Sequence, residues 1–168
     1  VDLIAEQVGN AKVAVHASTE SGLESQAEEL GALLADAGVD IALTTIGTIS
    51  YSDDEVASLA EQDSFAEQWR SAGVEYVVAL GNAAVGAAYA IDNGRLHDEI
   101  TLITSLISVR ALGALTPDLG PLSLIGIAAP DYPRVADQGL HEAPACIERV
   151  ERELGEEVIA YPTEEQLN

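Results

Sequence analysis

Short apolar runs that alternate with helical patterns are the feature of this 168-residue chain that most constrains its fold. Five runs have the length and composition of buried β-strands, at residues 13–17, 40–46, 76–80, 100–104 and 122–128. Helical segments lie between them. The alternation predicts an α/β domain with a doubly wound, mainly parallel sheet and helices on both faces. We expect residues 1–168 to form one such domain.

Helix boundaries are predicted from capping residues. Ser21-Gly22-Leu23-Glu24 and Ser64-Phe65-Ala66-Glu67 fit the capping box, in which a hydroxyl and a carboxylate each bond an unpaired backbone amide. The helices that follow are expected to end at Gly38 and Gly73. Residues 47–63 are polar and are expected to be irregular. Further expected elements are a small-residue helix at 83–93 closed by Gly94, helices at 105–115 and 143–154, and a strand at 158–161.

The net charge of −22 argues against several classes of partner. There are 29 acidic and 7 basic residues, and Lys12 is the only lysine. Nucleic-acid binding needs a basic face that displaces counterions from phosphates, so no nucleic-acid partner is expected. Anionic membrane surfaces are disfavoured for the same reason. The acidic residues are spread along the whole chain, which indicates a solvated surface suited to a salty environment rather than a site.

Residues typical of catalysis or metal binding form no recognisable group. His16, His97 and His141 lack metal-ligand spacing, and the single cysteine, Cys146, is expected to be a small buried side chain. The GxSxG, GxxxxGK[ST] and GxGxxG motifs are absent from the sequence. We therefore expect no enzymatic activity, no cofactor and no metal. His16 falls late in the first strand, where either a buried structural role or a position in a cleft is open.

Small polar residues follow three of the expected strands. In parallel α/β sheets, ligands bind outside the carboxyl ends of the strands, so these loops are the places where a site is expected. Helix capping is the competing role for each loop, and the two roles can coexist. The candidate ligand-binding residues are Ser18, Thr19, Ser21, Asn82, Ala83, Thr104 and Ser105.

Three segments together have the pattern of a known family. The first joins residues 12–16, a Ser/Thr loop that ends at Gly22 and a helix over 30–39; the second, Phe65–Val78, reads F…Q…AGV-E-Y-V-V; the third is residues 90–94 followed by a strand. They resemble the C-terminal lobe of type I periplasmic binding proteins, the group that contains the branched-chain amino-acid receptors of ABC importers. The resemblance covers roughly residues 1–155.

The resemblance implies one lobe of a two-lobe receptor that captures a small polar ligand between its lobes. It implies an N-terminal lobe of the same chain, an ABC-transporter permease as partner, and an extracytoplasmic location, periplasmic or as a cell-surface lipoprotein. A start at Val1 without a signal peptide is then expected for a piece of a longer protein. By position, the family's ligand loops fall at Ser21, 81–83 and 105–106. All three depart from the amino-acid-binding pattern, so a branched-chain amino acid is not expected.

A flavodoxin-like FMN-binding electron carrier is the competing interpretation. Residues 16–25 resemble the flavodoxin phosphate loop, and small acidic doubly wound domains are typical of that family. Against it, aromatic residues make up only 4% of the chain, and the loops at 46–52 and 81–84 offer at most Tyr51 to stack on a flavin. The ligand-sensing lobe of a regulator is a third possibility. A yellow purified protein would indicate flavin.

Overall fold

The computed structural model describes residues 1–127 except 20–21, 49–54, 106–107, 110–111 and 113–118. The expected helix at 143–154 and the expected strand at 158–161 lie outside the described residues, as do Ser21, His141 and Cys146. Of the expected helix at 105–115, the described residues Ser108, Val109 and Leu112 are helical.

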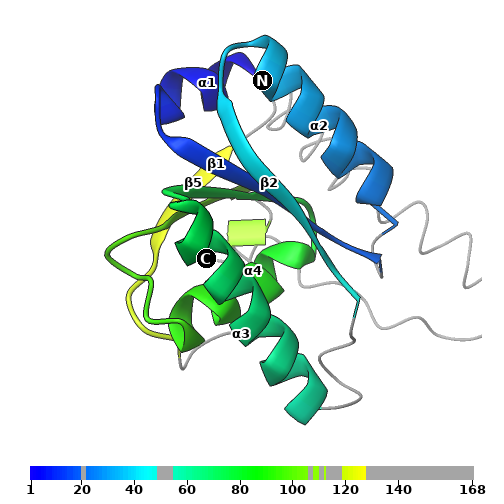
Figure 1. The fold of residues 1–168 in the computed structure, drawn as a ribbon, viewed down its shortest axis with the longest axis vertical. Helices are drawn as coiled ribbons and strands as arrows, with labels where there is room; N and C mark the ends of the chain where they lie inside the picture. The colour runs from blue at the N-terminus through cyan, green and yellow to red at the C-terminus, as the bar shows by residue number, and fades with distance from the viewer. Residues whose placement is uncertain (20–21, 49–54, 106–107, 110–111, 113–118, 128–168) are drawn as a thin grey trace, which may run out of the picture. The chain divides into compact units, whose positions relative to one another are not determined.

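Five parallel strands form one sheet in the order β2-β1-β3-β4-β5 (Figure 1). The predicted parallel α/β sheet is confirmed, because every strand is present and each of its ends lies within one residue of the predicted end. The strands are β1 Lys12–Ser18, β2 Asp40–Gly47, β3 Tyr76–Ala79, β4 Thr101–Ser105 and β5 Ser123–Ile127.

Helices cover both faces of the sheet and bury two separate cores. On one face, α1 (Asp2–Val8) and α2 (Glu24–Asp36) pack on side chains that include Val13 and Val15 of β1. On the other, α3 (Glu55–Ala72) and α4 (Ala83–Asn93) pack on side chains that include Ala14. Figure 1 shows α2 and α3 on opposite sides of the strands. None of the described helices is long and apolar enough to cross a membrane.

The first half of helix α3 differs from the sequence prediction. The helix begins at Glu55, so the capping box predicted at Ser64–Glu67 is wrong and those residues lie inside the helix. The inner face of the first half is polar: Ser58 and Gln62 are buried and hydrogen-bonded, whereas Val56 and Leu59 are exposed. This inverted pattern of polar inside and apolar outside hides the helical periodicity that an amphipathic segment normally shows.

Helix ends were predicted better than helix starts. Helix α2 begins at Glu24 with Leu23 in the N-cap position and no side-chain cap, so the predicted box starting at Ser21 is not the start that forms. Gly38 and Gly73 end α2 and α3 as predicted, with φ of +90° and +71°. In both places the next amide bonds back to a carbonyl of the last turn, which is the Schellman arrangement.

Gly94 ends α4 as predicted, but for a different reason. Its φ is −73°, and the left-handed residue is Arg95, with φ +54°. A Cβ on Gly94 would lie 2.6 Å from the Cβ of Ala66 on α3 and 2.9 Å from the carbonyl oxygen of Ala90. Glycine is therefore required here because α3 and α4 approach each other closely.

Replacing Gly94 with alanine should destabilise the fold. The added methyl has no space, and overpacking of this kind costs about 1–3 kcal/mol. Gly31→Ala in α2 is the matched control, because its Cβ would meet nothing nearer than 3.7 Å. That control should stabilise the protein by up to about 1 kcal/mol through helix propensity. Urea unfolding followed by circular dichroism measures both, and equal effects of the two substitutions would refute the close-packing explanation.

Candidate functional site

The carboxyl ends of all five strands lie at one edge of the sheet, because every strand is parallel to its neighbours. β1 and β3 are adjacent, and the helices that follow them, α2 and α4, cover opposite faces. This is a topological switch point, where ligands of open α/β sheets bind. We call the following residues the carboxyl edge: Ser18, Thr19, Gly47, Thr48, Leu80, Gly81, Asn82, Ser105 and Ser108.

Hydrogen bonds join the loops of the carboxyl edge to one another. The Thr19 hydroxyl, after β1, donates to the carbonyl of Gly47 at the end of β2 over 3.3 Å. The Ser108 hydroxyl, after β4, donates to the carbonyl of Gly81 after β3 over 3.2 Å. Gly81 has φ +56°, and a Cβ there would lie 3.0 Å from the side chain of Leu23, so the loops after β1 and β3 are also in contact. These contacts connect the loops that follow four of the five strands to one another.

The predicted site residues divide into exposed and buried groups. Thr19, Asn82 and Ser105 are exposed on the carboxyl edge, at the ends of three neighbouring strands. Ser18 is buried at the end of β1. The Thr104 hydroxyl is also buried and donates to the carbonyl of Ala79 over 2.8 Å. The remaining two are Ala83, which belongs to the buried core, and Ser21, which lies outside the described residues.

The side chain of Ser105 caps a helix, whereas the side chain of Asn82 does not. Ser105 accepts a hydrogen bond from the backbone amide of Ser108 over 3.1 Å, as an N-cap does. Asn82 occupies the N-cap position of α4, yet its side chain makes no capping bond. The carboxamide of Asn82 is therefore not engaged in capping, which leaves it suited to contact a ligand.

The first amides of α4 do not form an anion-binding site. Those of Ala83, Ala84 and Val85 already donate to the carbonyls of the three residues from Leu80 to Asn82. The start of α2, like that of α4, has no side-chain cap. In the described part of the carboxyl edge, the amides that begin α4 are therefore already engaged.

A buried histidine lies behind the carboxyl edge, on the α3 side of the sheet. His16 is fully buried, which answers the question left open by the sequence and rules out a position in a solvent-filled cleft. Its Nδ1 is 2.9 Å from the hydroxyl oxygen of Thr45 on β2. Its ring makes edge-to-face contacts with Phe65 and Trp69 of α3, at centroid distances of 4.9 and 5.6 Å. Its Nε2 has no hydrogen-bond partner among the residues that the structure describes.

Burial keeps His16 uncharged. Desolvation lowers the pKa of the imidazole from 6.5 to about 4, although Glu61 and Thr45 act to raise it. The indole Nε1 of Trp69 donates to the Thr45 hydroxyl oxygen over 3.4 Å. The Thr45 hydroxyl therefore contacts both the imidazole and the indole, and which of Thr45 and His16 donates in their contact depends on the imidazole tautomer.

Glu61 is a residue of this region that sequence reasoning missed, because residues 47–63 were expected to be irregular. Its carboxylate accepts hydrogen bonds from the backbone amide and the hydroxyl of Thr48, over 2.8 and 2.6 Å. These bonds fix the end of β2 to the first half of α3. The carboxyl edge is therefore coupled to the position of that helix.

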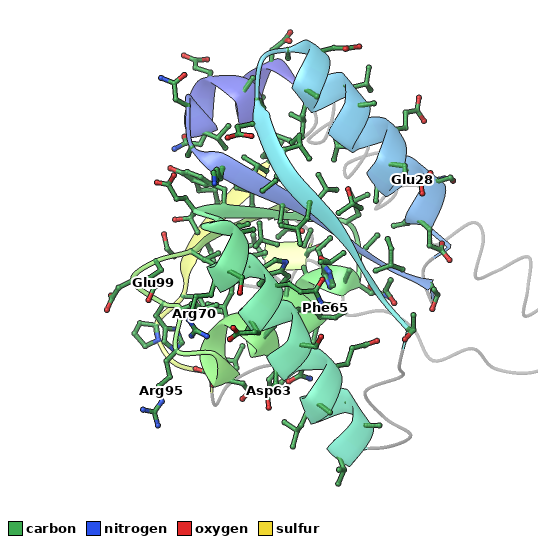
Figure 2. All side chains as sticks on the ribbon, viewed as in Figure 1. Glu28, Asp63, Phe65, Arg70, Arg95 and Glu99 are labelled. Carbon is green, nitrogen blue, oxygen red and sulfur yellow. The ribbon has the colours of Figure 1, made fainter. Side chains whose placement is uncertain are left out.

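The described basic residues lie away from the carboxyl edge. Lys12, at the start of β1, donates to the carbonyl of Ala72, and Arg70 donates to the carbonyl of Gly94. Figure 2 shows Arg70 and Arg95 on the side away from the carboxyl ends of β1 and β2. In the described part of the carboxyl edge, the available ligand contacts are hydroxyls, an amide side chain and backbone groups. A search of the same residues finds no cluster that could hold a metal ion.

Comparisons with known proteins found no match: no family model, no curated protein and no solved structure is similar to this chain.

Replacing Thr45 with valine should destabilise the protein strongly. The substitution keeps the shape of the side chain but leaves His16 Nδ1 and Trp69 Nε1 buried without a partner. Each unsatisfied group costs about 1–3 kcal/mol, so we expect a loss of about 2–4 kcal/mol. Thr44→Val is the control, since Thr44 is exposed on the same strand and its replacement should change stability by less than about 0.5 kcal/mol. Similar losses for the two variants in urea unfolding would contradict the assigned network.

Proposed function

We propose that this chain is the second lobe of a two-lobe solute-binding protein of an ABC importer, with the carboxyl edge as its ligand-binding face. The observation that carries the proposal is the exposed set Thr19, Asn82 and Ser105, which lies at the ends of the adjacent strands β1, β3 and β4. The set surrounds the switch point of the sheet, where ligands of such folds bind. The resemblance of three sequence segments to type I periplasmic binding proteins supports the same assignment.

The chemistry of the edge fits a small polar ligand. Its exposed side chains are the hydroxyls of Thr19, Thr48 and Ser105 and the carboxamide of Asn82, which donate and accept hydrogen bonds without adding charge. The histidine nearest to the edge, His16, is buried and uncharged, so the described edge is assigned binding rather than catalysis. None of the three ligand loops carries the amino-acid-binding pattern, so the proposal does not include a branched-chain amino acid.

A second lobe is part of the proposal because an exposed edge alone leaves much of a ligand in water. If each lobe supplied half of the binding free energy of a micromolar complex, one lobe would bind only at about millimolar concentration. Closure of two lobes removes water and adds the second set of contacts. An N-terminal lobe in the same chain, an importer permease as partner and an extracytoplasmic location belong to this proposal.

A flavodoxin-like electron carrier is the alternative, and the strand order agrees with it. The order β2-β1-β3-β4-β5 is also that of flavodoxins, which bind FMN at the switch point between β1 and β3. The described part of the carboxyl edge has no aromatic side chain to stack on a flavin, since Phe65 and Trp69 are buried beneath α3. The absorption spectrum of the purified protein distinguishes the two, because only bound flavin makes it yellow.

The proposal is tested with the full-length protein that contains this chain. A thermal-shift screen of small polar solutes identifies a ligand, and calorimetry then measures its affinity for alanine variants of Thr19, Asn82 and Ser105. Each lost hydrogen bond should weaken binding about two- to thirteenfold, since a typical one contributes about 0.5–1.5 kcal/mol.

Ser71→Ala is the matched control, because this exposed serine lies on the last turn of α3, away from the carboxyl edge. It should leave the affinity unchanged. Unchanged affinity in all three edge variants would place the site elsewhere and reject the proposal. A yellow protein that releases FMN on denaturation would replace it with the flavodoxin function.

A further inference from the structure

One buried polar group in the core beneath α3 is only half satisfied. His16 has 0% exposure and is enclosed by Phe65 and Trp69. Within the described part of the chain, its Nδ1 has a partner and its Nε2 has none. A buried polar nitrogen without a partner lowers stability, and a buried imidazolium would lower it far more. The site therefore tolerates the neutral ring and opposes the charged one.

The same residues attach α3 to the sheet. The hydroxyl of Thr45 is hydrogen-bonded both to the imidazole of His16 on β1 and to the indole of Trp69 on α3. The rings of Phe65 and Trp69 stack on each other with their centroids 6.1 Å apart. One turn earlier on the helix, Glu61 holds Thr48 at the end of β2. Displacement of this part of α3 therefore also releases a strand end of the carboxyl edge.

We propose that His16, Thr45, Phe65 and Trp69 form a pH-sensitive latch, which acid opens by protonating His16 and so loosens α3 from the sheet and from Thr48. The inference concerns the conformation of the chain and does not depend on the proposed function. It applies whether the carboxyl edge binds a transported solute or another ligand.

Burial lowers the pKa of His16 more than the charges around the latch raise it. Glu61 is the titratable group that acts on His16 by charge, and it raises the pKa, but desolvation is the larger effect. β2 and β3 face His16 with Thr45 and Ala79, which carry no charge. Among the side chains that the structure describes, the other ionisable groups on the packed elements lie farther along them: Asp63, Glu67 and Arg70 on α3, Asp40 on β2, Tyr76 on β3, and Tyr89 and Asp92 on α4.

The sign of the pH effect follows from the two pKa values. In the closed latch His16 titrates at about 4, and in the open one near its ordinary value of 6.5. Above pH 6.5 both forms are neutral and the latch has its full stability. As pH falls from 6.5 toward 4 the open form binds the proton first, so the opening equilibrium constant should rise about 30-fold by about pH 5. Protonation of surface carboxylates acts in the opposite direction, because it lowers a net charge of −22 and its self-repulsion.

The chain has a built-in reporter for the test, because Trp69 is its only tryptophan. We would measure Trp69 fluorescence and hydrogen exchange of the α3 amides between about pH 8 and about pH 5, corrected for the intrinsic pH dependence of exchange. The latch predicts red-shifted emission and exchange of α3 about 30-fold faster at the lower pH. An NMR titration should give His16 a pKa well below that of a free histidine. An ordinary pKa for His16 would overturn the proposal.

Two variants separate the latch from general acid effects. His16→Gln retains an amide that can bond Thr45 but cannot be charged, so it should abolish the acid response of α3. His97→Gln is the control, since His97 pairs with Asp92 over 3.0 Å outside the latch, and it should respond like the parent protein. If His16→Gln fails to fold, the NMR pKa of His16 and the exchange of α3 in the unmodified protein still decide. Full acid response in a folded His16→Gln variant would also overturn the proposal.

Discussion

The burial of β1 at the centre of the sheet is the constraint on which the rest of the described structure depends. The strand pairs with β2 on one side and β3 on the other, and every residue from Val13 to Ser18 is buried. Because side chains alternate along a strand, Val13 and Val15 form the core beneath α1 and α2, while Ala14 and His16 face α3 and α4. The chain leaves β1 toward one face and β3 toward the other, which creates the switch point at the carboxyl edge.

His16 occupies a buried position on β1, where an apolar side chain would leave no polar atom unpaired. The site instead carries a ring that is neutral because it is buried, and its one hydrogen bond depends on the hydroxyl of Thr45, which also serves Trp69. Helix α3 is therefore attached to the sheet by apolar packing together with one shared polar contact. Through Glu61 and Thr48, the same helix fixes a strand end of the proposed ligand face, so stability and site geometry are connected through α3.

The sequence predicted the features that depend on local patterns. Buried parallel strands appear as continuous apolar runs, and Gly38 and Gly73 marked helix ends because glycine adopts positive φ at little cost. The first half of α3 was missed because its buried face is polar and its exposed face carries Val56 and Leu59. The contact of His16 with Thr45 joins residues 29 apart in sequence, so no local pattern reports it.

The loops proposed as the candidate site lie at the carboxyl ends of the strands, and whether they bind a ligand stays a prediction. Thr19, Asn82 and Ser105 are exposed, whereas Thr104 and Ala83 are buried. Thr104 is buried because side chains alternate between the faces of a strand, and Ala83 is buried because the first turn of α4 packs on the core.

A crystal structure of the full-length protein with a solute found by screening tests the central claim most directly. The account predicts that the solute lies at the carboxyl edge and bonds Thr19, Asn82 or Ser105. A solute bound on a helix-covered face or at the amino ends of the strands would contradict it.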